Sequence, residues 1–241
     1  MESFDIIISI NVHEKPNFLI KQLENIQKYV KSSYIIILNC NDYMYCELQQ
    51  NNIIKNYNVI LNPNYFNKNT FDGTLCKGIY TNILYALQNY TFKYFIILSS
   101  REIFYNELFT YNLDNMSKVT DYYNINNINI NKTENNWHWA TFGKTLLFKY
   151  YLQNNKLVAH SAHEGLCFDY NTCNNIKLFL ELHNDIEENL FNFKWCVEEF
   201  ALQTIAVNES NGFINIGNGV ITFNSSDNLP TYKFTYKIQR I

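Results

Sequence analysis

The sequence predicts an α/β protein in which helices flank a mixed, mainly parallel sheet within a single domain. First, four apolar, β-branched runs alternate with three helical segments over residues 4–99, an order typical of parallel sheets. Second, the length of 241 residues suits one large domain. Third, 47% of the residues are hydrophobic and 17% are aromatic, which is enough apolar surface for a sizeable core.

Each predicted element has its own local signal. The runs 4–12, 34–39 and 93–99 are predominantly apolar and β-branched, as strands buried on both faces are. The run 58–61 is shorter and ends at an Asn-Pro-Asn turn. The helices carry apolar residues at three- and four-residue spacing, and a proline stands at the start of the first one. The predicted helices span 17–29, 45–51 and 75–90.

The pattern is looser after residue 103. Residues 114–136 are polar and predict a loop-rich segment. The elements predicted beyond it are a strand at 137–142, helices at 143–153 and 191–206, β-structure at 212–223 and a last, basic strand at 231–241.

Composition excludes some classes of protein. The net charge is −3 and no block of Lys and Arg stands out, so we expect no nucleic-acid partner. Six cysteines occur without a CxxC pair, which favours reduced thiols. The stretch MESFDIIISI resembles neither a signal peptide nor a membrane anchor. We therefore expect a cytoplasmic protein without a transmembrane segment; a microbial or large-virus enzyme would fit.

Polar residues follow each strand of the predicted sheet. Ligands of open α/β sheets bind beyond the carboxyl ends of the strands. The segments that come together there are 11–15, 39–42, 62–65 and 99–102. Polar loops would also be present in an α/β domain without a site, so this pattern alone does not define one.

Four stretches, in this order, resemble a known enzyme family. They are IIISINVHEKPNFLIKQLENI, KYFIILSSREIFY, NWHWATFGKTLLFKYYL and WCVEEFALQTI. Together they resemble the core-2/I-branching N-acetylglucosaminyltransferases, a family that includes the peptide O-xylosyltransferases and has the Rossmann-like GT-A fold. The resemblance implies a nucleotide-sugar-binding half at 1–103 and an acceptor-binding half, with a C-terminal basic tail, at 104–241.

The chain also departs from the family pattern. Val197 and Glu198 replace the Pro and Asp of a Pro-Asp-Glu motif, and Ser100 replaces a Gly. The Gly-Ser that precedes the family's Trp is absent. These departures leave open a different donor, a different acceptor or a loss of activity.

The resemblance implies a general base. An inverting transfer needs one group to take the proton of the attacking hydroxyl. The residue that matches the family's base is Glu199, and Glu198 would then hold a sugar hydroxyl or orient the helix. The alternative is a helix start, where carboxylates interact favourably with the amide dipoles.

The diphosphate side of the site is predicted to be metal-independent. The chain has no Asp-x-Asp, and Ser100, Arg101 and Glu102 stand where that motif would lie; a single carboxylate is a poor cage for a hard cation. The resembled family uses basic residues instead. The candidates for this role are Arg101, Lys233, Lys237 and Arg240. Lysines that protect an edge strand are the alternative for the tail.

The remaining candidates are predicted to line the binding sites of the two substrates, the donor nucleotide and the acceptor. For the nucleotide they are Val12, His13, Asn41, Asp42 and Asp72. For the acceptor and sugar they are His138, Trp139, Glu164 and Glu102, with the tryptophan as a stacking wall. Plain turns and core strands can also account for most of these positions.

The sequence therefore predicts an inverting glycosyltransferase that uses a UDP-sugar, carrying N-acetylglucosamine or xylose, and a glycan or glycoprotein acceptor, with no cofactor. One alternative is a GT-A-like module that binds a sugar nucleotide or glycan without turnover. Another is a zinc-dependent hydrolase, whose ligands would come from His160, His163, Glu164, Cys167 and Cys173. Their spacing matches no closed zinc module.

Overall fold

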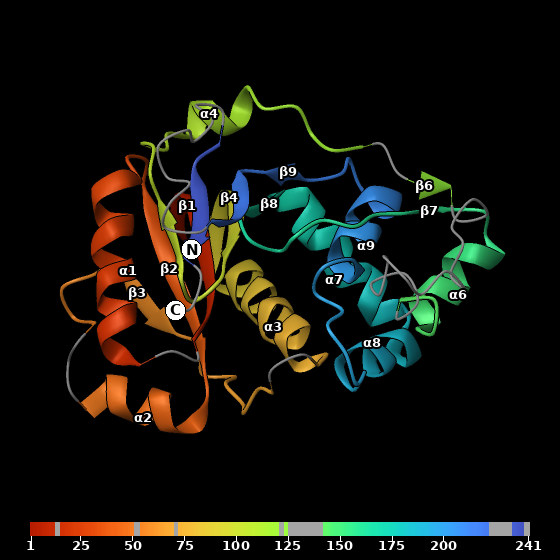
Figure 1. The fold of residues 1–241 in the computed structure, drawn as a ribbon, viewed down its shortest axis with the longest axis horizontal. Coiled ribbons are helices and arrows are strands. Elements are labelled where there is room, and N and C mark those ends of the chain that lie inside the picture. The colour runs from red at the N-terminus through yellow and green to blue at the C-terminus, as the bar shows by residue number, and fades with distance from the viewer. Residues whose placement is uncertain are drawn as a thin grey trace.

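The computed structural model describes residues 1–12, 15–50, 54–69, 72–120, 123–124, 142–221 and 233–238. These residues form a single α/β domain whose six-stranded sheet has the order β3-β2-β1-β4-β8-β9, flanked by helices (Figure 1). The strands of this sheet are β1 (Glu2–Val12), β2 (Tyr34–Cys40), β3 (Val59–Leu61), β4 (Tyr90–Leu98), β8 (Leu166–Asp169) and β9 (Ile214–Asn215).

The parallel half of the sheet confirms the four predicted strands. β1 lies between β2 and β4 and pairs in parallel with both, and β3 pairs in parallel with β2. β8 and β9 then extend the sheet with antiparallel pairing. The carboxyl ends of the four parallel strands therefore lie at one edge, next to the start of β8.

Helices cover both faces of the sheet because the strands are apolar on both faces. On β1, Ile6, Ile8 and Ile10 belong to a buried cluster with residues of α1 (Pro16–Tyr29) and α2 (Asp42–Gln50). Ile7 belongs to a second cluster with α3 (Thr74–Asn89), α7 (Tyr170–Leu182), α8 (Asn184–Phe191) and α9 (Ala201–Glu209). Figure 1 shows these two helix layers on opposite sides of the sheet.

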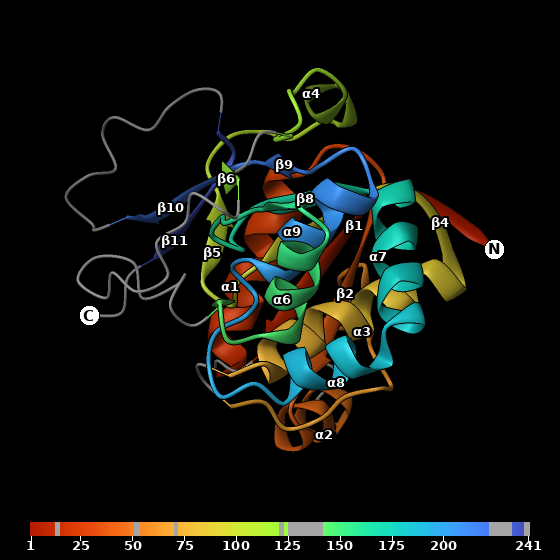
Figure 2. The same ribbon diagram turned by 90° about the vertical axis from the view of Figure 1, so that its right-hand side faces the viewer.

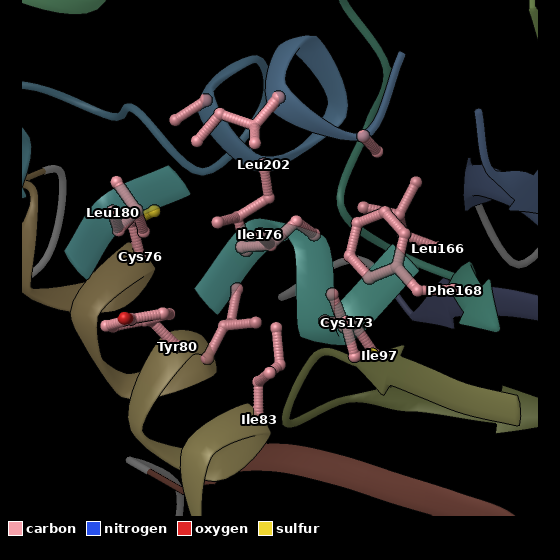
Figure 3. Close-up of a cluster of buried hydrophobic side chains, with 14 of the residues drawn as sticks. Cys76, Tyr80, Ile83, Ile97, Leu166, Phe168, Cys173, Ile176, Leu180 and Leu202 are labelled. Atoms are coloured by element: carbon pink, nitrogen blue, oxygen red, sulfur yellow. The ribbon is translucent and has the colours of Figure 1, made fainter. Parts of the chain in front are cut away.

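The second cluster joins the two parts of the chain. Figure 3 shows Cys76 and Tyr80 of α3 beside Ile176 and Leu180 of α7, with Leu202 of α9 above them. All five side chains are at most 2% exposed. Cys173 is also buried there, and all six cysteines are free thiols, as the sequence predicts.

The helix predicted at 191–206 is wrong over its first half. α8 ends at Phe191 and α9 begins only at Ala201. The intervening segment packs on the start of α3, where Gly73 donates its backbone N–H to Phe193 O at 2.9 Å. Apolar spacing alone did not reveal this interruption, in which Lys194 and Trp195 are exposed and Cys196 and Val197 are buried.

Two further helices were not predicted. α7 is capped by Asp169, whose carboxylate accepts from the backbone N–H of Thr172 at 2.7 Å. α8 follows it after His183. The predicted helix at 143–153 begins later, as α6 (Leu146–Gln153), because the Thr145 side chain caps it. Of the predicted strand at 137–142, only Phe142 lies within the described residues, and it is helical, so the prediction is wrong there.

Smaller sheets complete the fold. β11 (Thr235–Ile238) lies between β10 (Gly217–Ile221) and β5 (Glu102–Phe104), and Figure 2 shows this layer beside the main sheet. It confirms the β-structure predicted for 212–223 and, over β11, the predicted last strand. The short elements that remain are α4 (Thr110–Asp114), β6 (Tyr123–Asn124) and β7 (Leu157–Val158). Within the described ranges, no helix is both long and apolar enough to cross a membrane.

Two glycines allow the small sheet to cross the main one. Gly165 has φ +68°, a left-handed conformation that side chains disfavour. A Cβ on Gly165 would lie 2.3 Å from the backbone nitrogen of Gly217, and a Cβ on Gly217 would lie 2.3 Å from Glu164 O. This crossing fixes the position of Glu164 beside the carboxyl end of β4.

Candidate active site

The adjacent carboxylates Glu198 and Glu199 lie in a turn directly before α9. Val197 O accepts from the backbone N–H of Ala201 at 2.9 Å, which begins the helix. Val197 and Phe200 are fully buried, so the apolar residues on either side of the pair anchor the turn. The cap residue, Phe200, makes no side-chain capping bond. The pair is therefore placed near the helix start, as predicted, without a carboxylate at the cap position.

The two carboxylates have different surroundings. Glu198 is 3% exposed, and its Oε2 has no hydrogen-bond partner. Burial raises its pKa, and this effect outweighs the lowering by nearby His163. The Glu199 side chain is 24% exposed, with its Oε2 3.6 Å from His160 Nε2. Only Glu199 of the pair is thus accessible to a substrate from solvent.

The segment 159–165 holds both histidines against this turn. Ser161 donates its backbone N–H to Glu199 O at 2.9 Å. Buried Gln203 of α9 donates to Ser161 O and to Glu198 O, both at 2.9 Å. Thr204 accepts from the backbone N–H of Ala159 at 3.0 Å and donates to Ala159 O at 3.1 Å. The polar pair Gln203-Thr204 therefore fixes the loop that carries His160.

Glu102 follows β4 and is fully buried. It accepts from the backbone N–H of Ser99 at 3.0 Å and from the Thr235 hydroxyl. Burial raises its pKa to about 8, and the neighbouring Glu164 adds to this effect. Gln22 of α1 donates to both Ser99 O and Glu102 O at 2.7 Å. Glu102 is thus held within the fold, away from a solvent-borne substrate.

Glu164 lies between Lys237 and His163, just before β8 begins. Its Oε1 accepts from Lys237 Nζ, and its Oε2 is 3.6 Å from His163 Nδ1. Burial acts to raise the pKa of Glu164, but His163 and Lys237 together outweigh burial, so the pKa is lowered. Because Glu164 is only 5% exposed, a sugar would reach it only if this ion pair opened.

The C-terminal basic residues are held by internal partners. β11 places Lys237 opposite Glu102 in the strand register. Arg101 donates from Nη1 to Ile238 O at 2.8 Å. Lys233 donates to Asn215 O at 2.6 Å, and burial lowers its pKa. A diphosphate that used Lys233 or Lys237 would have to displace these contacts.

The residues predicted for the nucleotide lie beyond β1 and β2, where they also stabilise local structure. Val12 ends β1 and is 2% exposed. The Asn41 side chain accepts from the backbone N–H of Met44 at 2.9 Å. Asp42 and Asn67 form a reciprocal pair, with Asn67 Nδ2 donating to Asp42 Oδ2 at 2.8 Å.

Asp72 forms a turn at the start of α3. It accepts from the backbone N–H of Thr74 and from Asn69 Nδ2, both at 2.9 Å. Burial acts to raise its pKa, but hydrogen bonds from the Thr74 hydroxyl, from Asn69 and from the Thr74 backbone outweigh burial and lower it. The turn interpretation therefore accounts for its contacts. Four predicted residues lie outside the described part of the chain: His13, His138, Trp139 and Arg240.

The alternative zinc cluster does not assemble. Cys167 lies within β8 and Cys173 within α7, both fully buried, and burial raises the pKa of each thiol. The described residues contain no group of three or more His, Cys, Asp or Glu side chains placed to hold a metal ion.

An open hollow of about 530 Å³ lies between α6 and α8. Its lining residues include Asp185, Glu188 and Lys194 and none of the predicted site residues. We place the candidate site at the carboxyl edge of the sheet, where the segment 159–165 carries the His160–Glu199 contact near one end and the Glu164–Lys237 ion pair near the other.

Sequence comparisons find no matching protein-family model and no match among curated proteins.

Proposed function

We propose that the protein is a GT-A-like, inverting and metal-independent glycosyltransferase. It transfers a sugar, N-acetylglucosamine or xylose, from a UDP-sugar to a hydroxyl of a glycan or protein acceptor. The observation that carries this proposal is the contrast within the carboxylate pair. Glu199 is accessible and faces His160, whereas Glu198 is buried.

Support also comes from the placement of the site. A mostly parallel sheet favours ligand binding at its carboxyl edge. The segment 159–165 runs from the Glu199 turn to β8, which lies beside the end of β4. The accessible carboxylate is thus linked, through a single short segment, to the edge where a nucleotide is expected.

The proposed reaction needs one proton transfer. The acceptor oxygen attacks the anomeric carbon, while the bond from that carbon to the diphosphate oxygen breaks and UDP leaves. Glu199 takes the proton of the acceptor hydroxyl. His160, 3.6 Å from the Glu199 carboxylate, restricts its orientation. Basic residues near the diphosphate stabilise the charge of the leaving group.

The test measures UDP release and sugar transfer with a panel of UDP-sugars, with and without EDTA. We expect turnover with one donor that EDTA does not reduce. Glu199→Gln should lower turnover by about 10²- to 10⁴-fold, the usual contribution of a general base. The melting temperature should change little, because the Glu199 side chain is partly exposed.

Two controls make the result specific. Glu181→Gln changes an exposed carboxylate on α7 and should leave turnover unchanged. UDP binding by Glu199→Gln should match the wild type. Full activity of Glu199→Gln would overturn the assignment of the base. Stabilisation by a UDP-sugar without turnover in the wild type would favour the binding-module alternative.

A further inference from the structure

Lys68 is a partly buried cation at the carboxyl end of β2. Its Nζ donates to Cys40 O at 2.9 Å and to Phe66 O at 3.2 Å. Both acceptors are neutral carbonyl oxygens. Within the described residues, no carboxylate lies within 4.0 Å of this ammonium group. A buried charge is costly unless it is paired, and among the described residues this ammonium group has no carboxylate partner.

A second cation faces the same ring. Lys68 Nζ is 4.9 Å from the centre of the Phe66 ring, and Lys77 Nζ is 5.0 Å from it. Lys77 is exposed on the first part of α3 and likewise makes no ion pair with a described residue. Two ammonium groups therefore lie on one aromatic side chain at the edge of the sheet.

The helix is shaped to admit this lysine. Gly78 lies inside α3, where glycine costs about 1 kcal/mol relative to alanine. A Cβ at Gly78 would lie 2.9 Å from Lys68 Cε and 2.3 Å from Asn11 Oδ1. Lys68 therefore lies close to Asn11, next to the end of β1, where open α/β sheets bind phosphate-bearing ligands.

The nearby charges leave the site cationic. Burial lowers the pKa of Lys68 to about 8, partly offset by Cys40 and Asp42. Burial raises the pKa of Cys40 to about 12, so that thiol is neutral at pH 7. Asp42 is paired with the Asn67 amide. Glu187 interacts with Lys77 electrostatically, but the two side chains form no ion pair.

We propose that Lys68 and Lys77 form an anion site that binds the phosphate groups of a nucleotide beyond the carboxyl end of β2. The identity of that nucleotide as the uridine diphosphate of a donor rests on the proposed function. Lys68 supplies a hydrogen-bonded charge from within the fold, and Lys77 supplies a second charge from the surface. Neither residue belongs to the basic tail, whose lysines are engaged by Glu164 and Asn215.

The test is calorimetric titration of the intact protein with UDP, uridine, ADP and pyrophosphate. UDP and pyrophosphate should bind the wild type, and uridine should bind more weakly than UDP. Lys68→Met should weaken UDP binding about tenfold, as expected for the loss of one charge-assisted hydrogen bond. Lys77→Met should weaken it about threefold, because that charge is exposed.

Lys149→Met is the matched control, because Lys149 is an exposed lysine on α6. Thermal melts check that each variant is folded. If Lys68→Met is unfolded, the UDP affinity of Lys77→Met decides whether the site is correct. Wild-type affinity for UDP in both Lys68→Met and Lys77→Met would overturn the site and leave the glycosyltransferase proposal standing. Binding of ADP or pyrophosphate but not UDP, with the same lysine dependence, would support the site and overturn the donor. No binding of any probe would overturn both.

Discussion

Glu102 should make the folded protein less stable as the pH rises. Its pKa is raised from 4.5 to about 8 by burial. Between these two values the folded chain keeps a proton that the unfolded chain has lost, so the unfolded chain binds fewer protons. The free energy of unfolding therefore falls with increasing pH in this range. This stability is fully present below pH 4.5 and is lost as the pH rises through about 8.

The magnitude follows from the same two values. Each pKa unit of difference between the folded and unfolded states corresponds to 1.36 kcal/mol of unfolding free energy. Relative to low pH, the free energy of unfolding is thus lower by about 1 kcal/mol at pH 5 and by about 4 kcal/mol at pH 8. Glu102→Gln removes the titrating group and retains an amide oxygen that accepts from Ser99 N–H. The Thr235 hydroxyl can then accept from the amide instead of donating.

We expect the stability difference between Glu102→Gln and the wild type to change by about 3 kcal/mol in favour of the variant between pH 5 and pH 8. The assay is urea unfolding of both proteins at several pH values. Subtracting the two curves cancels the titrating groups that do not interact with Glu102. Glu188→Gln, at an exposed carboxyl group on α8, is the control. A difference that does not vary with pH would refute the argument, because it would mean that Glu102 is ionised in the folded protein.

Two further predictions concern the backbone around the site. Gly165→Ala should destabilise the protein by on the order of 3 kcal/mol, from left-handed strain and a backbone clash. Its melting temperature should fall by roughly 6–12 °C, and an unchanged melting temperature would contradict the crossing geometry. Thr204→Val should cost about 1–3 kcal/mol in urea unfolding, because both backbone groups of Ala159 lose their partner. The variant should also lower turnover by releasing His160; unchanged stability would show that water replaces the hydroxyl.

The carboxyl-edge site could be anticipated only in part. The family resemblance placed Glu199 in a motif and implied site roles for Glu164 and Lys237, and the structure brings the segments of these three residues together. It did not reveal that Lys237 and Glu164 pair with each other, because strand register between β11 and β5 depends on contacts more than 130 residues apart in the chain. The role proposed for Lys68 was not anticipated, because a lone lysine in a loop has no sequence signal. The glycine inside α3 was the available clue.

What the sequence by itself determined is the parallel half of the sheet and the helices that pack on it. Continuous apolar runs are buried on both faces wherever they occur, so β1, β2 and β4 follow from local pattern. Only the tertiary structure decided how β8 and β9 extend this sheet, how β11 pairs with β5 beside it, and which carboxylates these strands bury. Burial and charge pairing are properties of groups that meet in space, so the contrast between Glu198 and Glu199, adjacent in the chain, emerges only when α9 packs against the segment 159–165.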